Sequence, residues 1–390
     1  MGSRALEGIR VADLSGQLAG AGGTRFLAAM GADVIRIEDP VRQGMWDTQR
    51  GGHPVRDGTS GINASGSFNQ HNVEKRGVTI NLKDDDGRRL FERLVAISDV
   101  VCENFAAGVM DKLGYGYERL REMKSDIIYV SNCGFGHTGP YGSFKTWGPV
   151  VQAFCGLTFS SGLPEMPSAG IGYSYMDHHG GNFMAIAILA ALVHRRRTGE
   201  GTWVDMACTE AGAALLGPVV LDATVNGRNL RRPGMPNSNR SSSPLMAPHG
   251  IFPAAGEDNW VAIACRDDED WARLARVVGE PWATGAKWVS LAQRVACEDE
   301  LDELIRAWTV LHDRFTLSEK LQAAGVRTAA VQRPSDRVLE TSTVVSSRRN
   351  GADSASQRRM QLEDQARKRV GVILELERTV SWDHAKLQRD

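Results

Sequence analysis

The sequence predicts an α/β fold built on a parallel sheet, followed by a second, smaller domain. Short apolar segments alternate with helical segments from the N-terminus onward, and this alternation is typical of parallel strands joined by crossover helices. The chain has 390 residues, of which 42% are hydrophobic and 24% are charged. This length and composition are those of a globular chain that can form two cores.

The elements of the first domain follow from apolar runs and their punctuation by Gly, Ser and Asp. Expected strands cover 9–14, 32–37, 77–82, 99–102, 127–132 and 202–206, and expected helices cover 19–30, 84–96, 110–123 and 209–225. The apolar run 183–193 is expected to be a buried core helix. Residues 134–176 are rich in Gly, Pro and Ser, and a loop of that length is usually functional.

The composition changes again after residue 226. Gly, Arg, Pro, Asn and Ser dominate 227–248, and a new unit begins at His249 with helices expected at 269–278, 298–309 and 318–324. Few apolar residues follow residue 345, so we expect a poorly ordered tail from there. A divergent terminus and a translated frameshift would both give such a tail, and both alternatives stay open.

Charge and cysteine usage exclude several classes of protein. The formal net charge of −1 gives no global field for nucleic acid or an anionic membrane. The six cysteines form no CxxC pair, which favours reduced thiols and a cytoplasmic protein and argues against a zinc finger. The N-terminus lacks a signal-peptide pattern, and the run 183–193 is too short to span a membrane. We expect no metal, because His178 and His179 are adjacent and no third ligand stands at metal spacing.

The glycine-rich segment 15–23 follows the first expected strand and invites a dinucleotide-binding interpretation. The third glycine of that pattern is missing, because Arg25 occupies its position. Close packing of backbone is therefore the favoured explanation of these glycines.

Asp177 stands between the long loop and the apolar helix. A carboxylate there can cap the helix, whose dipole favours negative charge. Alternatively it can act as a nucleophile that is ionised at neutral pH without a base. Gly180 and Gly181 follow it, and their N–H groups could hold an oxyanion while a substrate approaches closely.

Several motifs together resemble one family. They are LEGIRVADLSGQLAG at 6–20, GADVIRIEDP at 31–40, NVEKRGVTINLK at 72–83, DVVCENFAAGVMDKLG at 99–114, IIYVSNCGFGHTGPY at 127–141 and MDHHGGNFMAIAILAALVHRRRTGEGTWVDMACTEA at 176–211. Two more, APHGIFPAAGEDNWVAIAC at 247–265 and LQAAGVRTAAV at 321–331, continue the series. The chain resembles the family III (CaiB/BaiF-like) CoA-transferases, a group that also includes α-methylacyl-CoA racemases. We expect the resemblance to end after Leu339.

The resemblance implies an acyl-CoA:carboxylate CoA-transferase in which Asp177 forms an anhydride and then a CoA thioester. Coenzyme A enters as the acyl-CoA co-substrate, and the partners are an acyl-CoA donor and a carboxylic acid acceptor. The implied CoA contacts are Gln17, Arg36, Asn104, Phe105 and Lys112, with Lys75 and Lys145 as weaker candidates. The family often has Arg at the position of Lys112, and Lys lacks the bidentate guanidinium.

The implied fold is a Rossmann-like large domain with a smaller inserted α+β domain, in an interlocked dimer. The corresponding boundaries are 1–226 for the large domain, 227–325 for the small domain and 326–390 for the return to the large domain. A homodimer is expected, and a heteromer stays open.

Two other functions stay open. The first is a racemase or isomerase acting on CoA esters, although Trp147-Gly148 stands where the racemase branch has its histidine and the nearest histidine is His137. The second is a non-catalytic acyl-CoA-binding partner subunit, suggested by the unusual tail.

Overall fold

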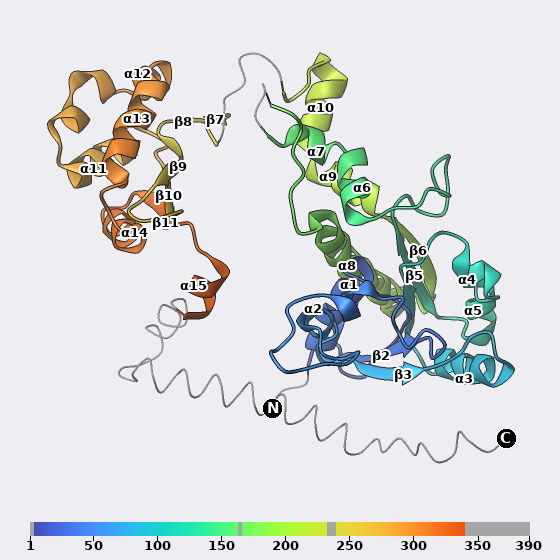
Figure 1. Cartoon of the computed structure of the whole chain (residues 1–390). Helices are drawn as coiled ribbons and strands as arrows, with labels where there is room; N and C mark the ends of the chain where they lie inside the picture. Colours follow the sequence, from blue (N-terminus) through green and yellow to red (C-terminus); the bar gives the residue numbers. More distant parts are fainter. Residues whose placement is uncertain (1–3, 163–165, 232–238, 340–390) are drawn as a thin grey trace. The chain divides into compact units, whose positions relative to one another are not determined.

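The structure is a computed structural model, and it describes residues 4–162, 166–231 and 239–339. The chain forms two compact units, one up to Ser238 and one from Asn239 onward (Figure 1). The expected tail from about residue 345 lies outside the described residues.

The first unit is built on a six-stranded parallel sheet with the order β3-β2-β1-β4-β5-β6. This is the doubly wound order, in which the connections reverse direction between β1 and β4. The strands are β1 (Arg10–Asp13), β2 (Asp33–Glu38), β3 (Arg76–Thr79), β4 (Val100–Glu103), β5 (Ile128–Cys133) and β6 (Thr202–Ala207).

Helices cover both faces of this sheet, which explains why its central strands read as short apolar runs. On one face α1 (Ala19–Ala29) packs along α8 (Tyr175–Thr198), where Leu27 and Ile188 share a core with Val11. On the other face α3 (Asp85–Ala96), α4 (Val109–Lys112) and α5 (Tyr117–Met123) enclose a second core around Phe91 and Tyr115.

Three expected segments differ from the structure. The helix expected at 110–123 is two helices, because Gly114 takes a positive φ of 83° and Gly116 is packed against the carboxylate of Asp111. The helix expected at 209–225 is divided into α9 (Cys208–Leu215) and α10 (Gly217–Asn226), since Pro218 favours a helix start. The long loop 134–176 contains α6 (Gly148–Phe154) and α7 (Leu157–Ser160), and the earlier segment 39–75 holds η1 (Thr48–Gly51) and α2 (Gly66–His71).

The second unit has its own antiparallel sheet and core. Strands β9 (His249–Pro253), β10 (Trp260–Ala264) and β11 (Arg327–Ala330) pair in the order β11-β10-β9. A core of Trp271, Leu274 and Ile305, among others, packs on this sheet. The remaining elements are β7 (Ser241–Ser242), β8 (Leu245–Met246), α11 (Asp268–Val278), η2 (Pro281–Thr284), η3 (Ala286–Trp288), α12 (Leu291–Ala296), α13 (Glu298–Thr309), α14 (Arg314–Ala323) and α15 (Pro334–Leu339).

The pairing of β11 with β10 shifts the expected boundary between the small domain and the returning large domain, which was placed after residue 325. Residues 327–330 were expected in the returning large domain, yet they complete the sheet of the second unit. A strand in that register can bury Thr328 in the unit's sheet, so the second unit continues past residue 325. The return of the later chain to the large domain stays a prediction.

Among the described residues, no single helix is both long and apolar enough to cross a membrane. The bent pair of α9 and α10, which meet at 76°, meets the criterion by length and composition alone.

Candidate active site

The candidate site begins where the sheet reverses its winding, between β1 and β4. In an open α/β sheet, ligands bind beyond the carboxyl ends of the strands at this switch point. Gln17 follows β1, and Asn104 and Phe105 follow β4. The fold therefore brings three of the expected CoA-binding residues to the edge where a ligand is expected.

The side chain of Asn104 joins the two strand ends. Its Oδ1 accepts the Gly16 N–H at 2.8 Å, and its Nδ2 donates to the Gly16 carbonyl at 3.1 Å. A Cβ atom at Gly20 would lie 2.5 Å from Asn104 Oδ1, and one at Gly23 would lie 2.8 Å from the Gly181 carbonyl. These glycines therefore permit close packing of the backbone. This agrees with the explanation that the sequence favoured over dinucleotide binding.

Gln17 is held in an unusual conformation at the start of this turn. Its φ is 57°, in the left-handed region that non-glycine residues rarely adopt. Its Nε2 donates to the Trp46 carbonyl at 2.7 Å, and its Oε1 accepts from the Thr48 hydroxyl at 2.7 Å. The amide side chain thus ties the β1–α1 turn to the segment after β2.

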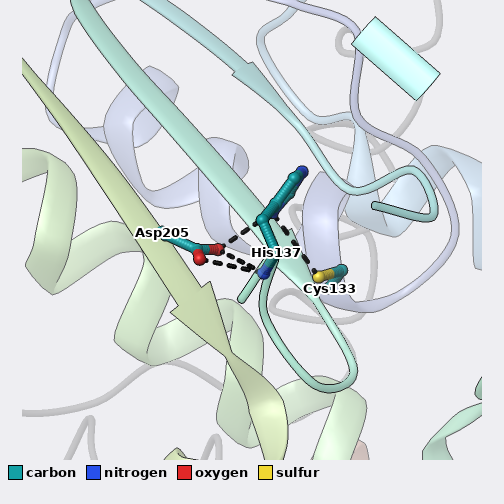
Figure 2. A group of neighbouring side chains, drawn as sticks. All are labelled: Cys133, His137 and Asp205. Atoms are coloured by element: carbon teal, nitrogen blue, oxygen red, sulfur yellow. Dashed lines mark hydrogen bonds and ion pairs between the residues drawn. The ribbon is translucent and has the colours of Figure 1, made fainter. Parts of the chain in front are cut away.

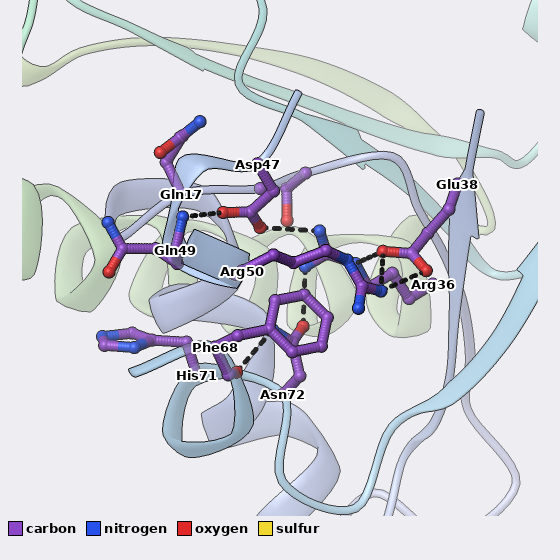
Figure 3. A network of polar contacts seen from close by, with 12 residues as sticks. Gln17, Arg36, Glu38, Asp47, Gln49, Arg50, Phe68, His71 and Asn72 are labelled. Atoms are coloured by element: carbon purple, nitrogen blue, oxygen red, sulfur yellow. Dashed lines mark hydrogen bonds and ion pairs between the residues drawn. The ribbon is translucent and has the colours of Figure 1, made fainter. Parts of the chain in front are cut away.

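Arg36 lies in a buried network beneath that segment (Figure 3). Only 3% of its side chain is exposed. It pairs with Asp47 at 2.7 Å and with Glu38 at 3.0 Å, and it donates to Asn72 Oδ1 at 2.7 Å. The guanidinium carbons of Arg36 and Arg50 lie 4.9 Å and 3.7 Å from the centre of the Phe68 ring. The described contacts make Arg36 a support for the 46–50 segment.

The other expected cations divide into two kinds. Lys75 is buried, with 1% of its side chain exposed, and its ammonium lies 3.2 Å from Asp13 and donates to the Ala21 carbonyl at 3.0 Å. Lys112, in the short helix α4, and Lys145, in the loop before α6, are both exposed. In this structure only the latter two present their charge to solvent.

Asp177 occupies the first turn of α8, as the sequence indicated. Burial raises the pKa of its carboxyl to about 6, and a hydrogen bond from Ser174 opposes that rise. At neutral pH the group is therefore mostly ionised and more basic than an ordinary aspartate. These properties suit a carboxylate nucleophile.

The surroundings of Asp177 are tight. A Cβ atom at Gly148, the first residue of α6, would lie 2.7 Å from Asp177 Oδ2. Burial, together with the charge of Asp177, raises the pKa of the Cys208 thiol to about 12, so this buried neighbour stays neutral. Cys208 Sγ in turn contacts Asn132 Oδ1 at 3.0 Å.

Gly180 and Gly181 have a packing role that differs from the expected oxyanion role. They lie beyond the first turn of α8, so their N–H groups fall within the helical hydrogen-bond ladder. A Cβ atom at Gly180 would lie 2.6 Å from Cys208 Sγ, and one at Gly181 would lie 3.0 Å from the Ala19 carbonyl. Both glycines let neighbouring elements approach α8 closely.

A pair of imidazoles that was not expected from the sequence, buried His71 and half-buried His178, lies next to Asp177. The rings of His71 and His178 lie 5.6 Å apart, and neither Nε2 atom has a hydrogen-bond partner among the described residues. Burial lowers the pKa of both groups. The adjacency of His178 to Asp177 was visible in the sequence, but the contact with His71 depends on the packing of α2.

The fold and the site together define an α/β enzyme with a ligand-binding switch point and a buried carboxylate at a helix start. The model of "CoA-transferase family III" matches residues 6–358, and the chain belongs to this family. The match continues past Leu339, where the resemblance was expected to end.

Named relatives carry several CoA-transferase activities. The chain is 34% identical over 307 residues to the succinate–glutarate CoA-transferase of Agrobacterium fabrum, covering 78% of this chain and 74% of the relative. It is 35% identical to the succinyl-CoA:mesaconate CoA-transferase of Haloarcula marismortui, covering 85% and 81%. A crystal structure of a CaiB/BaiF family protein from Brucella suis superposes with a TM-score of 0.76 at 30% identity, covering 86% of each chain.

Proposed function

We propose that this family III CoA-transferase exchanges CoA between an acyl-CoA and a free carboxylate through covalent intermediates on Asp177. The observation that carries the proposal is the Asp177 carboxylate, whose pKa burial raises to about 6 at the first turn of α8. A carboxylate of this kind is ionised at neutral pH and needs no partner base.

The proposed reaction has four acyl-transfer steps, each of which forms one bond to a carbonyl carbon and breaks another. Asp177 attacks the donor thioester, which gives a mixed anhydride and releases the CoA thiolate. The thiolate attacks the aspartyl carbonyl, which gives an aspartyl-CoA thioester and the free donor acid. The acceptor carboxylate then displaces CoA from that thioester, and the thiolate attacks the new acyl group, which restores the Asp177 carboxylate.

The position of several residues at the switch point between β1 and β4 supports a role for them in CoA binding. We assign Gln17, Asn104 and Phe105 to the ligand edge of the sheet, and Lys112 and Lys145 to the phosphates, because those two ammonium groups are exposed. Arg36 and Lys75 would act by positioning the neighbouring segments, since each is held by carboxylates. This division keeps all seven residues in the site while separating direct contacts from support.

Relatives guide the choice of substrates. Their names include succinate, glutarate, oxalate and mesaconate, so we propose dicarboxylic acids as the acceptor class. We further propose an interlocked cytoplasmic homodimer. Two relatives are named as the alpha and beta subunits of a succinyl-CoA–L-malate CoA-transferase, which keeps a heteromer as the alternative to be tested by co-purification.

The test is CoA exchange from succinyl-CoA to a panel of mono- and dicarboxylic acids, followed by mass spectrometry. Asp177→Asn keeps the size of the side chain and removes the nucleophile, so transfer is expected to be abolished. Hydroxylamine added with acyl-CoA should inactivate the wild type and label Asp177. Full turnover by the Asn variant would refute the assignment of the nucleophile.

A further inference from the structure

Three different metal-binding side chains converge at the end of β5, away from Asp177 in the sequence. Cys133 ends β5, His137 lies in the following loop, and Asp205 lies in the neighbouring strand β6 (Figure 2). Their donor atoms all lie within 4.8 Å of one another. No metal was expected from the sequence, because His178 and His179 are adjacent and no third ligand stands at metal spacing. This cluster was not considered, since Asp205 is far from Cys133 and His137 in the chain.

The separations suit a single small cation. Cys133 Sγ lies 3.9 Å from His137 Nδ1, and that nitrogen lies 2.9 Å from Asp205 Oδ1. Around a tetrahedral Zn²⁺, bond lengths of about 2.0 Å to nitrogen and oxygen and about 2.3 Å to sulfur place ligand atoms roughly 3.3–3.6 Å apart. The sulfur–nitrogen separation is a few tenths of an ångström longer than this range and the nitrogen–oxygen separation is a few tenths shorter, so small adjustments would bring both pairs to bonding distance.

A hydrolase-type Cys–His–Asp relay does not fit this cluster. Such a relay uses both ring nitrogens, with the nucleophile at one and the carboxylate at the other. Here the thiol and the carboxylate both approach Nδ1. Because the sulfur of Cys133 and the carboxylate of Asp205 both approach His137 Nδ1, one cation in place of the Nδ1 proton could bind all three side chains.

The carboxylate is held in position before any cation binds. Both Asp205 oxygens accept from the His137 backbone N–H, at 3.1 and 2.9 Å. These two contacts do not involve Nδ1, so they persist when Nδ1 becomes a ligand. They would orient Asp205 in the way that outer-shell hydrogen bonds orient metal-bound carboxylates.

The local charge is negative. Asp205 is a carboxylate, and a second carboxylate, Glu103, lies in the neighbouring strand β4. Glu103 accepts hydrogen bonds from the Phe105 N–H and the Tyr129 hydroxyl. A divalent cation would offset the charge of both carboxylates and stabilise the thiolate.

Space for a fourth ligand lies beside the ring. A cavity of about 370 Å³ is lined by His137, Tyr129 and Trp203 among others. A water molecule there could complete a tetrahedral set, as in sites with three protein ligands.

We propose that Cys133, His137 and Asp205 form a Zn²⁺ site that fastens the loop after β5 to the edge of the sheet. The mixed sulfur, nitrogen and oxygen donors favour Zn²⁺ over Mg²⁺ or Ca²⁺. Binding displaces the thiol proton to solvent and places the imidazole proton on Nε2. The role is structural, and it does not depend on the proposed transfer reaction.

The experiment is a titration of the full-length chain, freed of metal by a chelator and dialysis, with Co²⁺ and then Zn²⁺. One Co²⁺ per chain is expected, with a near-ultraviolet thiolate-to-cobalt charge-transfer band that Zn²⁺ abolishes. Cys133→Ser should remove the band and weaken binding by roughly 100-fold or more, the upper end of what an outer-shell contact is worth. Zn²⁺ should raise the Tm of the wild type and leave that of Cys133→Ser unchanged.

Cys155→Ser is the matched control, because Cys155 is also half-buried in the first unit, and it should keep the band. If the serine variant does not fold, as judged by circular dichroism, His137→Asn decides through affinity: it keeps the thiolate but should bind Co²⁺ roughly 100-fold more weakly. A wild type without the band, a band retained in Cys133→Ser, or an unchanged Co²⁺ affinity in His137→Asn would overturn the proposal.

Discussion

Replacing Asp177 with Asn is expected to stabilise the first unit at neutral pH while it abolishes transfer. Burial raises the pKa of Asp177 from the ordinary 3.8 to about 6. Between these values the folded chain binds more protons than the unfolded chain, so this group's contribution to stability falls as pH rises through that window. Above pH 6 the buried carboxylate is ionised and lowers the free energy of unfolding by its full desolvation cost. Asn carries no charge at any pH, so the Asn variant does not have this cost.

The size of the effect follows from the difference between the two pKa values. A rise from 3.8 to about 6 corresponds to roughly 3 kcal/mol at pH 7.5. At pH 5 the folded carboxyl is mostly protonated, and the same linkage leaves roughly half of that amount. Rehydration of the charged group makes both figures upper limits. The gain on substitution should therefore be larger at pH 7.5 than at pH 5.

The measurement is urea unfolding at both pH values, with hydrogen exchange in α8 to report on the first unit separately. Asp57→Asn, which removes a carboxylate from an exposed loop, serves as the control and should change stability little at either pH. A loss of stability in Asp177→Asn at pH 7.5, or a gain that is equal at the two pH values, would refute the argument that Asp177 is a desolvated carboxylate.

Two further outcomes are expected. Gly148→Ala should lower kcat by roughly 100-fold, since displacement of a reacting group by about 1 Å can cost that much, while CoA affinity and circular dichroism stay unchanged. Gly217→Ala is the control, because Gly217 also precedes Pro at a helix start but a Cβ atom there meets nothing within 4 Å. An equal loss of kcat in both variants would contradict the contact between Gly148 and Asp177. Racemase activity should be negligible beside transfer, because the family resemblance places Trp147 at the position of the racemases' histidine and racemisation needs two proton-handling groups on opposite faces of the α-carbon. Deuterium wash-in at the α-carbon of a 2-methylacyl-CoA, at a rate that rivals transfer, would contradict this expectation.

The parallel sheet could be predicted closely because its central strands are buried on both faces. The expected strand at 99–102 is Val100–Glu103 in the structure, and the one at 127–132 is Ile128–Cys133. The helix breaks were harder, since an apolar pattern continues through Gly114 and through Gly217-Pro218 while the backbone turns there. The helix α6 was missed because the Gly- and Pro-rich composition of its surroundings masks seven helical residues.

The position of Asp177 at a helix start could also be predicted, because the loop before it and the apolar helix after it are local patterns. Its contact with Gly148 could not. Gly148 reads as one more glycine in a loop, and only the packing of α6 against α8 shows that a side chain there would collide with the carboxylate. The zinc ligands are hidden for the same reason, because β5 and β6 are neighbours in the sheet but are separated in the sequence by the whole of α8.

The roles of Lys75 and Arg36 could not be predicted from their charge and sequence position alone. A basic residue near the end of a parallel strand is a reasonable candidate for a phosphate contact. What decides its role is the carboxylate that burial places beside it: Asp13 for Lys75 and Asp47 for Arg36. Removing one partner of such a buried pair leaves an uncompensated charge, which costs about 3–5 kcal/mol. Loss of CoA binding in a Lys75 or Arg36 variant would therefore accompany a loss of stability, whereas loss at Lys112 or Lys145, both exposed, would leave the fold unchanged.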